Sequence, residues 1–225
     1  MNPMSNAVMA ALVDAVDRAA ADPDVRVVVL TGAGDRAFSA GGDLRGGFVD
    51  RPLADHAARG ALVELIRRMR RCPKPIVARV NGHALGGGFG LLAAADLAVA
   101  VRGAKLGTPE IGVGLWPMII TAVLQPLAPQ RPLLEMMLVG RTFDADEAQA
   151  LGIVNRAVDR EELDEVVADY VDRLRSLSPA ILALGKRAFY AAADLDLDTA
   201  LDHLHHGLTA VATTEDAAEG IAAFG

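Results

Sequence analysis

Two glycine-rich segments could bring free backbone amides to one point. The first holds Gly41 and Gly42, and the second holds Gly86, Gly87 and Gly88. Glycine lets a ligand approach the backbone closely because it has no side chain. Two N–H groups that converge on one oxygen form an oxyanion hole, which would stabilise a thioester carbonyl as it becomes an enolate. The alternative is that these glycines only permit tight turns and close packing of helix on strand.

Glu110 is the candidate acid or base for such a site. A carboxylate can move a proton when the reacting group lies within hydrogen-bond reach. The segment Thr108-Pro109-Glu110 also makes a good helix start, with threonine as the cap, proline at the first position and an acid favoured by the helix dipole. His83 precedes the glycine triplet by three residues and could reach the same cavity, although a structural role in a turn is the simpler explanation.

The elements that must position these residues alternate between helix and strand. Apolar residues at helical spacing indicate helices, and β-branched runs bounded by turn residues indicate strands, of which Val25–Thr31 should be buried on both faces. Such alternation predicts an α/β protein whose parallel strands gather ligands at their carboxyl ends, where both glycine segments lie. The expected order is helix 4–21, strand 25–31, helix 55–71, strand 76–80, helix 88–95 and strand 97–101.

The second part of the chain has a different pattern. From about Pro129 onward it is mostly helical, with one short strand expected at 152–158 and long acidic helices after Arg160. This change predicts a catalytic body followed by a helical region for packing or assembly. In the segment 114–124, Trp116 and Pro117 could form an apolar wall for an acyl tail, but they also fit a place in the core.

One further glycine motif, GAGDRA at residues 32–37, resembles a dinucleotide-binding fingerprint that follows a strand. That fingerprint must open a helix whose N-terminus receives the pyrophosphate. Residues 38–43 contain too much glycine to propagate a helix, with a further glycine pair at 46–47. The motif therefore does not favour a nicotinamide cofactor.

Composition narrows the partners and the compartment. The net charge of −7 and an aromatic content of 4% disfavour a nucleic-acid partner. Cys72 is the single cysteine and no soft ligands cluster with it, so we expect a reducing cytoplasm and no metal. No stretch of 18 uncharged apolar residues occurs, so we expect no membrane association.

Four segments, in this order and spacing, resemble the crotonase superfamily of enoyl-CoA hydratases and isomerases. They are AFSAGGDL at 37–44, KPIVARVNGHALGGGFG at 74–90, LGTPEIGVG at 106–114 and LVGRTFDADEAQALGIVNRAV at 138–158. The resemblance covers nearly the whole chain. It implies a crotonase-like spiral of β-β-α units over residues 1–175, lacking strands that precede the first helix in that family, and a C-terminal helical oligomerisation region over 176–225.

The same resemblance implies roles for five residues of the glycine segments. Gly42 and Gly87 would supply the N–H groups of the oxyanion hole. The backbone around Ala40 would contact the adenine end of coenzyme A, and Leu44 would contribute to substrate binding. Asp43 would hold its loop through backbone hydrogen bonds, as aspartate commonly does in turns. Coenzyme A would be part of the substrate, with no separate cofactor.

Hydratases of this superfamily use two glutamates, and here only Glu110 is present because Gly90 stands at the position of the other. Adding water across a double bond needs a base and an acid, most simply two carboxylates. One carboxylate suffices to move a double bond from the 3,4 to the 2,3 position. The resemblance therefore implies an enzyme of fatty acid metabolism with one proton-transferring glutamate.

Several alternatives remain open at this point. The enzyme could be a hydratase, a 3,2-enoyl-CoA isomerase, or a related enzyme that forms an enolate from a bulkier acyl group, for which Gly90 would leave space. It could also be a non-catalytic acyl-CoA-binding relative. We expect a homotrimer or hexamer, assembled through the helices after about Ser178.

Overall fold

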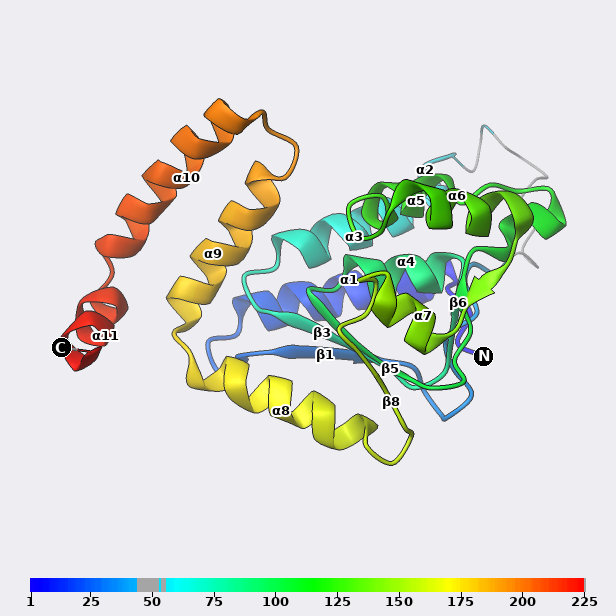
Figure 1. Ribbon diagram of the computed structural model, residues 1–225, viewed down its shortest axis with the longest axis horizontal. Coiled ribbons are helices and arrows are strands. Elements are labelled where there is room, and N and C mark those ends of the chain that lie inside the picture. The colour runs from blue at the N-terminus through cyan, green and yellow to red at the C-terminus, as the bar shows by residue number, and fades with distance from the viewer. Residues whose placement is uncertain (44–52, 54–55, 225) are drawn as a thin grey trace.

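The computed structural model describes residues 1–43, Leu53 and 56–224 (Figure 1). Its helices are α1 (Asn6–Ala21), α2 (His56–Arg59), α3 (Ala61–Arg71), α4 (Gly87–Ala94), the 3₁₀ helix η2 (Pro109–Val113), α5 (Met118–Leu124), α6 (Gln130–Val139), α7 (Ala145–Ala150), α8 (Leu163–Ser176), α9 (Pro179–Ala192), α10 (Leu197–Ala212) and α11 (Glu215–Phe224). Its strands are β1 (Val28–Thr31), β2 (Ala37–Ser39), β3 (Ile76–Val80), β4 (His83–Leu85), β5 (Leu97–Val101), β6 (Leu106–Gly107), β7 (Thr142–Phe143) and β8 (Arg156–Val158).

The strands form two sheets that the chain visits alternately. In the first sheet, with order β1-β3-β5-β8, all neighbours are parallel. In the second, with order β2-β4-β6-β7, only β7 runs antiparallel to its neighbour. Each of β1, β3 and β5 is followed by a strand of the second sheet and then by a helical segment. This is the predicted spiral of β-β-α units.

Helices cover both faces of the first sheet. Figure 1 shows α1, α3 and α4 on one face and α8 on the other. The helix α4 is buried from Gly88 to its end, with Phe89 at 0% and Leu92 at 1% exposure, because it lies between the sheet and α5. Strand β3 is central in the sheet, and its Val77 and Val80 are fully buried. The second glycine segment, which opens α4, therefore lies on a well-packed support.

Two predicted strands differ from the structure. The first is shorter than expected, forming only at Val28–Thr31, and it is not buried on both faces, since Val29 is 41% exposed. The reason is that α8 packs on this face over β3 and β5, whereas β1 lies at the edge of the sheet. The strand expected at 152–158 also shortens to β8, because Gly152 adopts a left-handed φ of 81° in a turn. At Asn155 the backbone N–H donates to the carbonyl oxygen of Ala98, and the side-chain oxygen accepts the N–H of Ala98.

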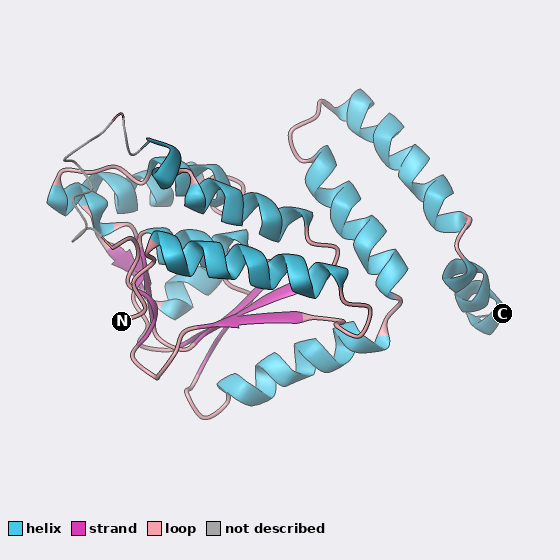
Figure 2. Cartoon of the chain, turned by 180° about the vertical axis from the view of Figure 1, so that it is seen from behind, coloured by secondary structure: helices cyan, strands magenta, loops and turns pink. Residues whose placement is uncertain are grey.

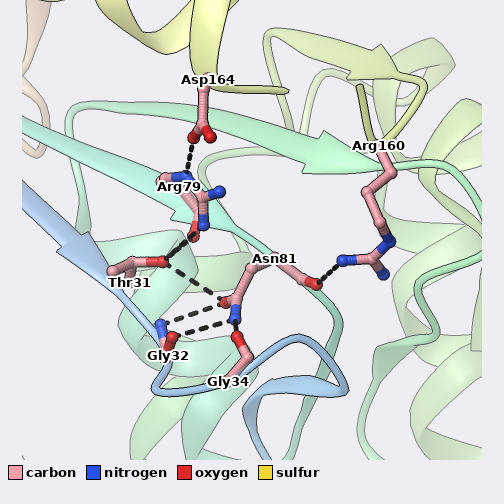
Figure 3. A network of polar contacts seen from close by, with 7 residues as sticks. All are labelled: Thr31, Gly32, Gly34, Arg79, Asn81, Arg160 and Asp164. Atoms are coloured by element: carbon pink, nitrogen blue, oxygen red, sulfur yellow. Dashed lines mark hydrogen bonds and ion pairs between the residues drawn. The ribbon is translucent and has the colours of Figure 1, made fainter. Parts of the chain in front are cut away.

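The side chain of Asn81 holds the loop that follows β1 (Figure 3). Its amide nitrogen donates to the carbonyl oxygens of Gly32 and Gly34, at 2.9 and 2.6 Å, and its oxygen accepts the Gly32 N–H. A β-carbon on Gly32 would overlap the carbonyl oxygen of Ala37, so the loop closes tightly. The loop leads into β2 and opens no helix, as the argument against a dinucleotide site predicted.

The C-terminal helices α9, α10 and α11 extend from the body of the molecule (Figure 2). A polar cluster ties α9 to that body, with Lys186 Nζ 2.6 Å from Asp96 and Tyr190 donating to the same carboxylate at 2.8 Å. Burial, followed by the charge of Asp96, raises the pKa of Tyr190. In the described part of the chain, no helix combines the length and apolar character needed to cross a membrane.

Candidate functional site

The first glycine segment packs directly against the second. Gly41 has a left-handed φ of 89°, which favours glycine, and a β-carbon there would lie 2.8 Å from the carbonyl oxygen of Leu85 and 3.4 Å from the nitrogen of Gly87. Ser39, at the end of β2, orients the segment because its hydroxyl accepts the Gly41 N–H at 3.2 Å. The chain that leaves β2 therefore crosses the turn between β4 and α4 at close range.

The two predicted amides lie close together at this crossing. The nitrogen of Gly42 is 3.9 Å from the position that a β-carbon on Gly87 would take. Gly87 is the first residue of α4, where N–H groups have no partner within the helix. Gly42 pairs with Met4 in an isolated bridge that uses the carbonyl of Gly41 and the N–H of Asp43. Within the described residues, the Gly42 and Gly87 N–H groups have no acceptor, so both remain available to a ligand.

Glu110 reaches the same crossing from η2. Its Oε1 would lie 2.9 Å from a β-carbon on Gly86, the residue that precedes α4. Its Oε2 is buried and has no hydrogen-bond partner among the described residues. Burial raises the pKa of the Glu110 carboxyl, although a hydrogen bond from its own backbone acts in the opposite direction. A partly desolvated carboxyl group with a raised pKa is suited to moving protons.

The helix start at Thr108 is only partly as predicted. Thr108 occupies the cap position and Pro109 follows at the first position, but the element is a five-residue 3₁₀ helix. The Thr108 side chain makes no capping bond, and its hydroxyl oxygen is buried without a described partner. Because Glu110 sits in this short, uncapped turn, capping does not account for its buried position.

Gly90 does not leave space for a bulky acyl group, which corrects the expectation from the sequence. A β-carbon at this position would lie 2.8 Å from the β-carbon of Ile120 and would overlap its Cγ2. Ile120 comes from α5, which packs along α4, and it is 2% exposed. The position opposite the missing side chain is therefore filled by an aliphatic group of the protein.

The remaining candidate residues are His83, Ala40, Asp43 and Leu44, and the first three make hydrogen bonds within the protein. The Nδ1 atom of His83 accepts the N–H of Lys105 at 2.9 Å, which is a structural role. The N–H of Ala40 donates to the carbonyl oxygen of Met1, and that of Asp43 donates to Met4. Leu44 lies outside the described residues.

Two further features concern packing and metal ligands. Trp116 packs against the hydrophobic core, and Pro117 is buried. Of the two alternatives for this segment, the structure therefore supports a place in the core. No group of three or more histidine, cysteine, aspartate or glutamate residues is arranged to hold a metal ion in the ranges that the structure describes.

Sequence reasoning missed three residues that build this site. Ser39 and Met4 contact the glycine segments, and a β-carbon on Gly87 would lie 2.6 Å from the terminal methyl of Met4. Ile120 fills the side of α4 next to Gly90. No local motif signals these contacts, because each depends on how distant segments pack.

Comparison with known proteins decides the family. The family model described as enoyl-CoA hydratase/isomerase matches residues 1–225. The chain belongs to the enoyl-CoA hydratase/isomerase family. It is 35% identical to a putative enoyl-CoA hydratase of Thermus thermophilus over 228 residues, covering 99% of this chain and 89% of the relative. It is also 35% identical to a carnitinyl-CoA dehydratase of Salmonella typhi over 211 residues, covering 90% of this chain and 79% of the relative.

Solved structures support the same family and its fold. An enoyl-CoA hydratase of Mycobacterium smegmatis superimposes with a TM-score of 0.93 at 32% identity, covering 99% of this chain and 86% of that one. The human enoyl coenzyme A hydratase domain-containing protein 3 gives a TM-score of 0.94 at 30% identity, covering 99% and 88%. The predicted crotonase-like fold with a C-terminal helical region is confirmed.

Proposed function

We propose that this member of the enoyl-CoA hydratase/isomerase family converts an acyl-CoA thioester through an enolate, with Glu110 transferring the proton. The Gly42 and Gly87 N–H groups would hold the thioester oxygen as it gains negative charge. The observation that carries the proposal is a carboxylate with one buried, unpaired oxygen beside two amides that have no other described acceptor. The backbone near Ala40 and the segment around Asp43 and Leu44 would receive the coenzyme A part of the substrate.

The single carboxylate favours double-bond isomerisation. Glu110 would take a proton from C2 of a 3-enoyl thioester and return it at C4, while the amides stabilise the dienolate. Ile120 packs against Gly90, so that side of α4 offers an aliphatic group in place of a second acid. A reaction that needs only one acid–base group fits this arrangement.

Hydration or dehydration of an enoyl thioester is the second candidate. Relatives at 35% identity are named putative enoyl-CoA hydratase and carnitinyl-CoA dehydratase. With one carboxylate, the reaction would require Glu110 to pass a proton through the reacting water molecule.

Parallel assays of 2-enoyl-CoA and 3-enoyl-CoA thioesters, with wild type and Glu110→Gln, test the proposal. We expect 3-enoyl turnover by wild type and a loss of at least about 100-fold in kcat with Glu110→Gln. Turnover of the 2-enoyl thioester alone would support the hydratase candidate. Binding of CoA thioesters without turnover of either would contradict the proposal and indicate a non-catalytic relative.

We also propose that the chain assembles into a homotrimer or hexamer through its C-terminal helices. Large apolar side chains are exposed along α10, with Leu197 at 73%, Leu201 at 56% and Leu208 at 66% exposure. Their spacing of four and seven residues places them on one side of the helix. An apolar strip of this kind is typical of a surface that another subunit covers.

A further inference from the structure

A cavity lies away from the glycine crossing. It is a cleft of about 560 Å³ between the C-terminal end of α3 and the helix α9, which lie side by side in Figures 1 and 2. Lys186 of α9 donates to the carbonyl oxygen of Met69 near this end of α3. The α3 residue nearest to Gly87 is Leu62. It precedes Arg71, which lines the cleft, by about nine residues, or roughly 13 Å along the helix. The cleft is therefore distinct from the proposed active site.

Three arginines line the cleft and have no anionic partner. Arg70, Arg71 and Arg187 form no ion pair with any residue that the structure describes. Arg70 lies over the ring of Tyr190, with its guanidinium carbon 4.2 Å from the ring centroid. Its Nε is buried and lacks a hydrogen-bond partner within the described chain. Because this Nε has almost no solvent-accessible surface, it is closed to a ligand, and the exposed side chains of Arg71 and Arg187 are the ones that an anion in the cleft could reach.

The neighbouring carboxylate does not neutralise this cluster. Asp96 already accepts hydrogen bonds from Lys186, Tyr190 and the N–H of Ile76. The protein carries a formal net charge of −7, so a concentration of unpaired cations at one cleft does not follow from composition. The local charge is opposite in sign to that of the whole molecule and would attract anions.

The other lining residues and the volume of the cleft indicate which kind of anion would fit it. Pro73 and Leu184 contribute apolar surface beside the arginines. The guanidinium fork matches the oxygens of a carboxylate or phosphate group. The cleft volume falls within the range of about 300–1,000 Å³ found for small-molecule sites.

We propose that this cleft binds a small organic anion, a carboxylate or phosphate ester with an apolar body. The exposed Arg71 and Arg187 would bind the charged group, and Arg70, stacked on Tyr190, would add positive charge beside it. This inference does not depend on the proposed reaction, because no residue of the glycine crossing lines the cleft.

Calorimetric titration of the full chain with phenyl phosphate and with benzoate tests the inference and separates the two anion types. We expect one saturable site per chain for at least one probe and no binding of uncharged phenol. The double substitution Arg71→Gln/Arg187→Gln should weaken binding at least tenfold, and Arg187→Gln alone should weaken it by less. Arg67→Gln is the matched control, since this exposed arginine lies on α3 outside the cleft.

Three outcomes would overturn the inference. One is the absence of saturable binding to wild type. A second is equal weakening by Arg67→Gln, which would indicate general charge attraction. The third is that the double substitution dissociates an oligomer in sedimentation, which would mean that a second copy covers the cleft and that the weaker binding reflects lost assembly. Glu110→Gln should leave probe binding unchanged, so failure of the proposed reaction and failure of this inference are distinguishable.

Discussion

Glu110 combines a buried, unpaired oxygen with a carboxyl pKa raised by burial. Burial without a partner disfavours the ionised form, so this residue lowers the stability of the folded protein at neutral pH. Retaining such a group is typical of functional sites, where activity takes precedence over stability. The residue is therefore expected to show a trade-off between stability and activity.

Glu110→Gln should raise the free energy of unfolding at neutral pH by less than about 1 kcal/mol, or at most about 3 °C in Tm, because a desolvated charge is removed but solvent screens part of the effect on this partly buried group. The folded pKa lies above the unfolded one, so the wild type loses stability as pH rises between them. The gain should disappear below about pH 4, where the wild-type carboxyl is protonated in both states. Thermal melts of both proteins from about pH 4 to neutral pH measure how the gain in Tm depends on pH. Glu161→Gln, at an exposed position, is the control, and a gain independent of pH would contradict the assignment.

Gly42 allows the amide and the side chain to be tested separately. No atom of the described residues lies within 4 Å of a β-carbon at this position, so Gly42→Ala should keep the fold and the N–H and should lower activity only as far as the added methyl group obstructs the substrate. Gly42→Pro removes the N–H, and we expect kcat to fall by about 100-fold or more, as for the loss of one oxyanion donor. Steady-state kinetics give the comparison, with Tm verifying the fold. Equal activities of the two variants would show that this amide takes no part.

The helix α4 shows how element packing limits what a sequence reveals. Its start within the glycine triplet and its apolar character were predictable from residues 85–96. The contact between Gly90 and Ile120 was not, because it depends on where α5 lies. Strands β2 and β4 were also missed, since each has only three residues beside glycine-rich turns. Periodicity cannot be read over so short a span.

Gly90→Ala should destabilise the protein by about 1–3 kcal/mol, because the added methyl group overlaps Ile120. In an Ile120→Ala background the same change should be less destabilising, which gives a coupling energy of about 1 kcal/mol in a double-mutant cycle. Chemical denaturation measures all four proteins. Gly185→Ala is the control, since open space surrounds this glycine within α9, and it should be neutral or slightly stabilising. Additive effects of the two changes would contradict the proposed packing.

At the scale of the whole molecule, the C-terminal helices have few apolar contacts with the body. The tie between α9 and the body is polar, through Lys186, Tyr190 and Asp96, whereas α10 exposes a row of leucines. The helical nature of this region was predictable from its periodicity. Its projection from the body was not, because the pattern does not say which molecule an apolar face covers.

Replacing Leu201 and Leu208 together by glutamate should shift the protein from a trimer or hexamer to a monomer, because both side chains lie on the exposed strip. Analytical ultracentrifugation measures the mass. Ala210→Glu adds a charge to the same helix at another exposed position and should leave the assembly intact. A monomeric wild type at micromolar concentration would rule out assembly through this surface.

The central claim is that Glu110 removes a proton from a thioester held by two backbone amides, and exchange of the C2 hydrogen tests it most directly. A 3-enoyl-CoA thioester is incubated with the enzyme in D₂O, and NMR measures how fast deuterium enters at C2 and C4. This measurement does not depend on which product accumulates. We predict rapid exchange with wild type and a rate at least about 100-fold lower with Glu110→Gln at unchanged thioester binding. Exchange at the wild-type rate in Glu110→Gln would contradict the account.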